Sequence, residues 1–138
     1  MRYPMTMKRE QGGYVLSFPD IPEAHSEADT REDALVYGQD ALLTAFEFYV
    51  EDGRPVPLPS ALKRGQVWIE VPVTVATKLL LLNEMSAQKV RPIDLARKLG
   101  MLPQEVNRLL DLRHRTKIDA IAQALNALGK RLELSLAA

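Results

Sequence analysis

The hydrophobic pattern of residues 1–28 predicts strands. Residues 3–9 are strand-like. Residues 14–18 are rich in aromatic and β-branched side chains, which favours extended backbone. Between them, Gln11-Gly12-Gly13 is a hairpin turn, because glycine tolerates positive φ. Pro19 and Pro22 end the second strand, since neither has an N–H to donate. Residues 24–28 are expected to form a short third strand.

A helix is expected next. Thr30 can cap its first turn, and Gly53 is a candidate C-cap. Apolar residues then recur at helical spacing on one face, namely Ala34, Leu35, Ala41, Leu42, Ala45, Phe46 and Tyr49. Gly38 lies on the same face, where it would allow close approach to a sheet. Pro55, Pro57 and Pro59 mark an extended connector, and residues 67–71 a last strand. The order β-β-β-α-β predicts a two-layer α+β unit.

The pattern of residues 75–128 is helical. Residues 75–88 are expected to form a helix with apolar residues along one side. Pro92 suits the first turn of a second helix. Residues 92–111 fit a helix-turn-helix template: Ala96 is small where two helices pack, and Gly100 sits at the turn. The expected interior positions are Leu95, Leu99, Met101, Val106, Leu109 and Leu110.

A helix-turn-helix would insert its second helix into the major groove of DNA. Gln104 and Asn107 can pair with adenine, and Arg108 with guanine. Basic residues nearby would hold phosphates without reading sequence, with Arg91 and Lys98 as further candidates. The predicted DNA-binding set is Gln104, Glu105, Asn107, Arg108, Arg113, His114, Arg115, Lys117 and Arg97.

The C-terminal stretch carries two further signals. Thr116 and Asp119 resemble a capping box that would open a helix over residues 117–128, which Gly129 would end. Residues 130–136 then alternate strictly between polar residues and Leu132, Leu134 and Leu136. This alternation predicts a short strand that pairs with its copy in a second chain and so forms a dimer.

Composition and charge narrow the class of protein. The 138 residues have no net charge, but residues 1–66 hold 11 acidic against 7 basic residues (−4), and residues 67–138 hold 7 against 11 (+4). Such a split suggests that the second half meets an anion such as nucleic acid. There is no cysteine, which excludes disulfides and a thiol nucleophile. Without a signal peptide or a membrane-length apolar run, the expected location is the cytoplasm.

One acidic loop is the remaining place for chemistry. It holds Asp20, Glu23, His25, Glu27 and Asp29. Their spacing matches no metal-ligand pattern, and no nucleophile, base and orienting residue are arranged for catalysis. We therefore predict no catalytic residue, no metal and no cofactor, and interpret the loop as an exposed acidic surface.

At this point the sequence resembles a known family. Residues 14–22 (YVLSFPDIP) followed by residues 30–34 (TREDA) are similar to the HicB antitoxins of bacterial toxin–antitoxin systems, and residues 92–129 resemble the Xre/Cro-like helix-turn-helix of one branch of them. Many members have Gly-Cys where Glu23 and Ala24 stand here, and Pro103 replaces a common Gln or Ser.

The resemblance implies a function. HicB proteins use a partial RNase H-like N-terminal domain without nuclease activity to cover the active site of HicA, a basic toxin that cleaves mRNA. Their C-terminal domain binds and represses the operator of the operon, and they form dimers or dimers of dimers. The acidic residues then become candidate toxin contacts, namely Asp20, Glu23, Glu27 and Asp29.

We therefore expect residues 1–72 to form a toxin-binding domain and residues 73–138 a DNA-binding and dimerisation domain. The predicted function is an antitoxin and autorepressor, with a HicA-type toxin, operator double-stranded DNA and copies of itself, as a dimer or a tetramer, for partners. An alternative is a stand-alone transcriptional regulator whose first domain senses a small ligand. A metal-dependent nuclease that uses the acidic loop is a third hypothesis.

Overall fold

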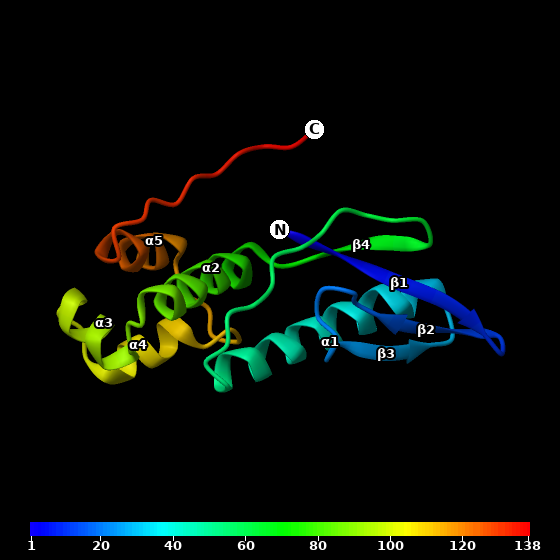
Figure 1. Ribbon diagram of the computed structural model, residues 1–138, viewed down its shortest axis with the longest axis horizontal. Coiled ribbons are helices and arrows are strands. Elements are labelled where there is room, and N and C mark those ends of the chain that lie inside the picture. Colours follow the sequence, from blue (N-terminus) through cyan, green and yellow to red (C-terminus); the bar gives the residue numbers. More distant parts are fainter. The chain divides into compact units, whose positions relative to one another are not determined.

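The computed structural model describes residues 1–138 and divides the chain into two compact units, Met1–Pro72 and Val73–Ala138. The first unit contains a four-stranded antiparallel sheet and one helix, and the second contains four helices (Figure 1). No helix combines the length and apolar composition that a membrane span requires.

The sheet of the first unit has the order β3-β2-β1-β4. Its strands are β1 (Arg2–Glu10), β2 (Gly13–Ser17), β3 (His25–Ala28) and β4 (Gln66–Glu70). The β1–β2 hairpin closes through Gln11 and Gly12, whose φ angles of 45° and 81° fit a two-residue turn that follows the twist of the strands. The predicted strands are therefore present, and β4 and β3 form the two edges.

One helix, α1 (Arg31–Glu51), covers one face of this sheet (Figure 1). It starts as predicted, because the Thr30 hydroxyl accepts a hydrogen bond from the backbone N–H of Asp33 at 3.1 Å. Gly38 lies on the buried face, where an added Cβ would overlap the sulfur of Met5. The prediction that Gly38 allows close approach of helix and sheet is confirmed.

Tyr3 connects the core of the first unit to the proline-rich connector. Its ring packs against Phe46 with centroids 5.4 Å apart, and its hydroxyl donates to the carbonyl of Pro57 at 2.6 Å. Burial raises the pKa of Tyr3, so the hydroxyl stays a donor. This contact fastens a segment that has no regular secondary structure of its own.

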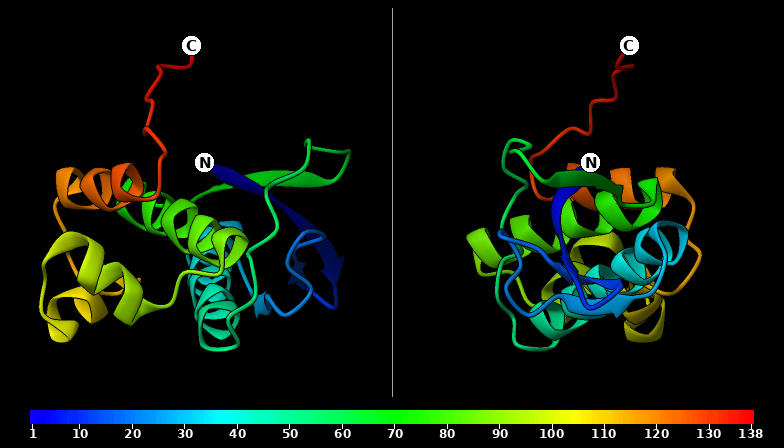
Figure 2. Two further views of the ribbon diagram at one scale, coloured as in Figure 1. Left: turned by 60° about the vertical axis from the view of Figure 1, so that its left-hand side comes forward. Right: turned by 90° about the vertical axis from the view of Figure 1, so that its right-hand side faces the viewer.

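The second unit contains α2 (Val73–Gln88), α3 (Pro92–Leu99), α4 (Pro103–Leu110) and α5 (Ile118–Ala127). These helices surround one core, and Figure 2 shows them in two further views. Polar contacts join α2 to the end of α5: Gln88 donates to the carbonyl of Leu128 at 2.8 Å, and Lys130 lies 3.9 Å from Glu84. The buried core residues are Leu81, Met85, Leu95, Ala96, Val106, Leu109, Leu110, Ile121, Ala124, Leu125 and Leu128.

In the second unit the predicted N-cap was wrong, and the predicted strand over residues 130–136 is absent from the single chain. The helix α5 begins at Ile118 with Lys117 as its N-cap and no side-chain cap, because the Thr116 hydroxyl lies 3.3 Å from Nδ1 of His114 instead. Residues 130–136 form no strand, and the tail leaves α5 without regular structure (Figures 1 and 2). A strand needs a backbone partner, and the single chain offers none to this segment.

Candidate functional sites

The helices α3 and α4 meet at a tight turn that residues 100–102 form. Gly100 has φ 64° and ψ 34°, the left-handed conformation that glycine adopts without strain. The N–H of Met101 donates to the carbonyl of Ala96 at 3.0 Å, which closes the end of α3. Ala96 and Val106 are buried in the hydrophobic core of this unit. The small residue, the glycine and the buried valine thus set the angle of this helix pair.

The polar face of α4 is open to solvent. Gln104, Glu105, Asn107 and Arg108 are all exposed, and the opposite face packs into the core through Val106, Leu109 and Leu110. Arg97 is exposed in the last turn of α3. The exposed face of α4 therefore offers amide and guanidinium groups that are not covered by the chain.

The segment after α4 carries the remaining basic candidates. Arg113, His114, Arg115 and Lys117 are exposed. The segment is folded locally, because the Asp111 carboxylate accepts from the backbone N–H of Arg113 at 2.9 Å and the Asp111 carbonyl accepts from that of His114 at 3.1 Å. Its backbone is thus ordered next to the end of α4.

Sequence reasoning missed Lys78, which lies on α2 and is fully buried. Its ammonium donates to three backbone carbonyls, those of Arg108 at 3.1 Å, Asp111 at 2.7 Å and His114 at 2.8 Å. Burial lowers the pKa of Lys78, and the Asp111 carboxylate opposes this shift. The sequence did contain a sign of this buried lysine, because Lys78 lies three residues after Val75 and so on the apolar side of the helix. A charged group that is buried there needs polar partners.

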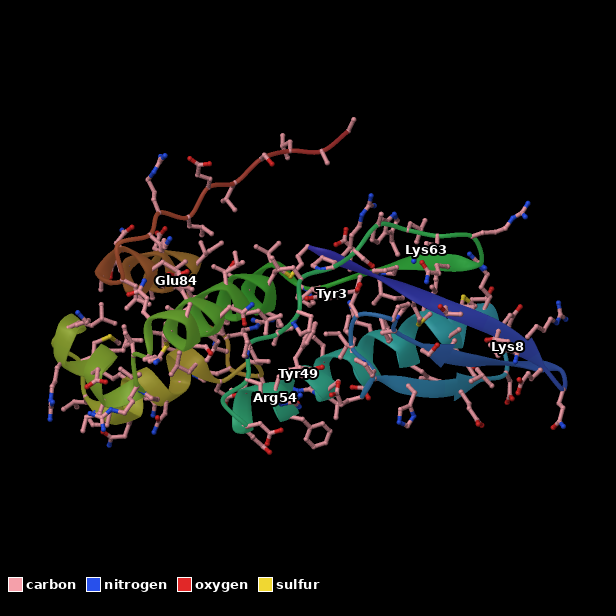
Figure 3. The ribbon with its side chains drawn as sticks, in the orientation of Figure 1. Tyr3, Lys8, Tyr49, Arg54, Lys63 and Glu84 are labelled. Carbon is pink, nitrogen blue, oxygen red and sulfur yellow. The ribbon has the colours of Figure 1, made fainter.

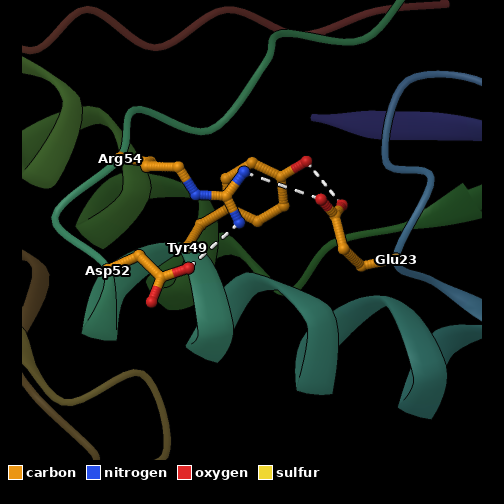
Figure 4. Close-up of polar contacts among 4 residues, drawn as sticks. All are labelled: Glu23, Tyr49, Asp52 and Arg54. Carbon is orange, nitrogen blue, oxygen red and sulfur yellow. Dashed lines mark hydrogen bonds and ion pairs between the residues drawn. The ribbon is translucent and has the colours of Figure 1, made fainter.

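Two of the four acidic candidates are engaged inside the first unit. Asp20 accepts from the backbone N–H of Ser60 at 2.9 Å and from its hydroxyl at 3.0 Å. Glu23 accepts from the hydroxyl of Tyr49 at 2.6 Å, while the Arg54 guanidinium lies over the Tyr49 ring, 3.6 Å from the Glu23 carboxylate (Figures 3 and 4). Both carboxylates therefore hold the connector and the end of α1 in place.

The hydrogen bond from the Tyr49 hydroxyl is the main cause that lowers the pKa of Glu23 below its ordinary value of 4.5, and the Arg54 guanidinium contributes less. The stability from ionised Glu23 is therefore present above pH 4.5 and is lost as the pH falls through the lowered value. We expect Tyr49→Phe to lose less stability than the wild-type chain on acidification through this range, measured by urea unfolding at several pH values. Tyr37→Phe, an exposed tyrosine of the same helix, is the control. An unchanged acid slope in Tyr49→Phe would contradict this assignment.

The other two acidic candidates, Glu27 and Asp29, line a separate groove of about 400 Å³. Glu10, Asp33 and the tyrosines Tyr14 and Tyr37 also line it. We call this feature the acidic groove. The structure therefore does not bring the four candidates together: Glu27 and Asp29 share the groove, whereas Asp20 and Glu23 face the connector.

The structure has no group of three His, Asp or Glu side chains that could hold a metal ion. His25 is exposed on β3.

The leucines of the C-terminal tail differ in their surroundings. Leu132 is partly buried against the helical core, whereas Leu134 and Leu136 are 74% and 102% exposed. Exposed apolar side chains such as those of Leu134 and Leu136 are often buried at a contact with a second protein chain. This exposure is compatible with pairing between copies.

Fold and site together define a small α+β protein of two units that presents a polar helix face on one unit and an acidic groove on the other. Comparison with known proteins gives the family. Residues 2–80 match the family model described as the HicB-like antitoxin of bacterial toxin–antitoxin systems. The chain belongs to this HicB-like antitoxin family.

Relatives extend the match over nearly the whole chain. The Antitoxin HicB 2 of Photorhabdus laumondii is 53% identical over 134 residues, 97% of this chain and 95% of that protein. The Antitoxin HicB of Escherichia coli K12 is 49% identical over 135 residues, 97% and 98% of the two chains. That of Pseudomonas fluorescens is 36% identical over 137 residues, 99% and 94%. Because antitoxins of this family are non-enzymatic, the chain is not an enzyme.

Proposed function

We propose that this protein neutralises a HicA-type, mRNA-cleaving toxin through residues 1–72, a partial RNase H-like domain, and represses its own operon by binding operator DNA through residues 73–138. The exposed polar face of α4, set at a fixed angle to α3 by Gly100, carries the DNA-binding half of the proposal. The family relationship supports the toxin-binding half. Both partners would be met in the cytoplasm.

For DNA, the pair α3–α4 acts as a helix-turn-helix whose second helix enters the major groove by its N-terminal residues. Gln104 and Asn107 read adenine, and Arg108 reads guanine. Glu105 accompanies them on the same face, and its carboxylate can accept from the amino group of cytosine. The phosphate contacts come from Arg97, Arg113, His114, Arg115 and Lys117.

For assembly, Leu132, Leu134 and Leu136 pair with the same residues of a second copy. The exposure of Leu134 and Leu136 supports this role. A two-fold dimer, or a tetramer built from two dimers, would place two copies of α4 on half-sites about 34 Å apart.

For the toxin, we place Asp20, Glu23, Glu27 and Asp29 at the interface with a basic partner. Of these, Glu27 and Asp29 lie in the acidic groove. No basic residue lines this groove. Charges of this kind act mainly through the rate of association, because they attract the partner before contact.

Charge reversal tests this surface. We expect Glu27→Lys with Asp29→Lys to slow association with the toxin by roughly tenfold or more at low salt, with a smaller effect at high salt. The measurement is surface-plasmon or stopped-flow kinetics with the product of the neighbouring small gene, in an inactivated form. Asp40→Lys with Glu51→Lys, two exposed positions of α1 outside the groove, makes the same charge change as a control. Equal rates in the two double variants would remove the groove from the interface.

Co-expression tests the function as a whole. The chain should co-purify with the product of the neighbouring small gene, relieve the growth arrest which that product causes, and reduce transcription from a reporter under the upstream region. Failure of relief with repression intact would favour the stand-alone regulator. Failure of both would refute the proposal.

A further inference from the structure

The strongest unassigned feature of the second unit is the buried ammonium of Lys78. All three of its N–H donors face backbone carbonyls, and all three carbonyls belong to residues 108–114. One acceptor, Arg108, lies in the last turn of α4, and the other two, Asp111 and His114, lie in the segment that follows. A single side chain from α2 thus holds both parts of the candidate DNA surface.

We propose that Lys78 is a positioning residue for DNA binding, which fixes the segment 111–115 against the end of α4. The inference rests on the proposed DNA-binding function. Because the segment is held in a fixed position relative to α4, Arg113 and Arg115 face the phosphates when α4 faces the bases. Lys78 itself is fully buried and touches no DNA.

The chemistry explains why a lysine stands here. The last carbonyls of a helix have no partner within the helix and carry partial negative charge. An ammonium satisfies three acceptors at once and is attracted to that charge. A buried charge is retained only where partners offset its desolvation. Methionine has a similar length and would fill the space, but it would remove the ammonium from all three carbonyls. The carbonyls of Arg108 and Asp111 would then keep only the backbone N–H groups of Asp111 and His114.

The first test uses the full chain without DNA. In Lys78→Met we expect backbone amides of residues 113 and 114, whose N–H groups are bonded to Asp111, to exchange with solvent about tenfold faster or more. Amides of Leu95 and Ile121 in the core are expected to change less. Lys89→Met, the same substitution at an exposed lysine beside the same helix, is the control. Unchanged exchange at residues 113 and 114 would overturn the proposal.

The second test measures coupling on DNA. The probes are a duplex that covers the region upstream of the chain's own gene and a scrambled duplex of equal length. Arg115→Gln alone should reduce the slope of log K against log salt by about 0.9, the value for one phosphate contact. In the Lys78→Met background the same change should have almost no effect on the slope, because the contact is already lost.

The outcomes separate the inference from the function beneath it. Equal effects of Arg115→Gln in both backgrounds, with binding of the upstream duplex intact, would overturn the role of Lys78 alone. Absence of binding by the wild-type chain would overturn both. If Lys78→Met does not fold, the wild-type chain still decides: hydrogen-bond couplings from the Lys78 ammonium to the carbonyls of 108, 111 and 114 support the proposal, and their absence refutes it.

Discussion

Replacing Phe46 by alanine is expected to destabilise the first unit by about 3–5 kcal/mol, the usual cost of emptying a fully buried aromatic site. Phe46 has no exposed surface, and its ring packs 5.4 Å from that of Tyr3. The lost ring leaves a cavity between α1 and β1 at the point where Tyr3 also holds the connector. Urea unfolding followed by the fluorescence of Trp68 measures the effect, because Trp68 is the only tryptophan and lies in the first unit.

A matched control lies two residues away. Phe48 belongs to the same helix but is 51% exposed, so Phe48→Ala is expected to cost less than about 1 kcal/mol. Because the two variants remove the same atoms, the difference between them isolates burial. Similar midpoints for Phe46→Ala and Phe48→Ala would show that α1 does not cover the sheet through Phe46.

The second large effect is expected on DNA. Gln104→Ala and Asn107→Ala should each reduce discrimination between operator and scrambled duplex by about 1–3 kcal/mol, the worth of one bidentate contact to a base. Both residues are exposed on α4, so their loss should leave folding nearly unchanged. Fluorescence anisotropy with both duplexes at two salt concentrations measures the ratio of affinities. The salt slope should stay the same, since neither side chain neutralises a phosphate.

The control for this experiment is Gln123→Ala, an exposed glutamine on α5 that is outside the proposed contact set. It should keep both the affinity and the discrimination of the wild-type chain. A loss of affinity for both duplexes alike in Gln104→Ala would mean that α4 contacts the DNA backbone and does not read bases.

The two units differ in how their charged residues are used. On the second unit, the polar residues of α4 and the basic residues after it are exposed. On the first unit, Asp20 and Glu23 hold the connector, and of the four acidic candidates only Glu27 and Asp29 lie in the acidic groove. Substituting Asp20 or Glu23 would therefore disturb both structure and toxin binding, whereas substituting Glu27 and Asp29 tests binding more cleanly.

Much of the local structure was determined by the sequence alone. The spacing of Ala34, Leu42 and Phe46 predicted the buried face of α1, and Thr30 predicted its start. The turn at Gly100 and the close approach at Gly38 followed from the absence of a side chain at each. These features depend on neighbours along the chain, so periodicity, caps and glycine positions are sufficient to predict them.

Only the tertiary structure decided the contacts that join distant segments. Glu23 meets Tyr49 across 26 residues, Asp20 meets Ser60 across 40, and Lys78 reaches His114 across 36. Charged residues look alike in sequence whether they face water or a buried carbonyl, because their partners are set by how the elements pack. The alternating leucines of the tail show the converse: a strand pattern forms no strand where the single chain supplies no backbone to pair with it.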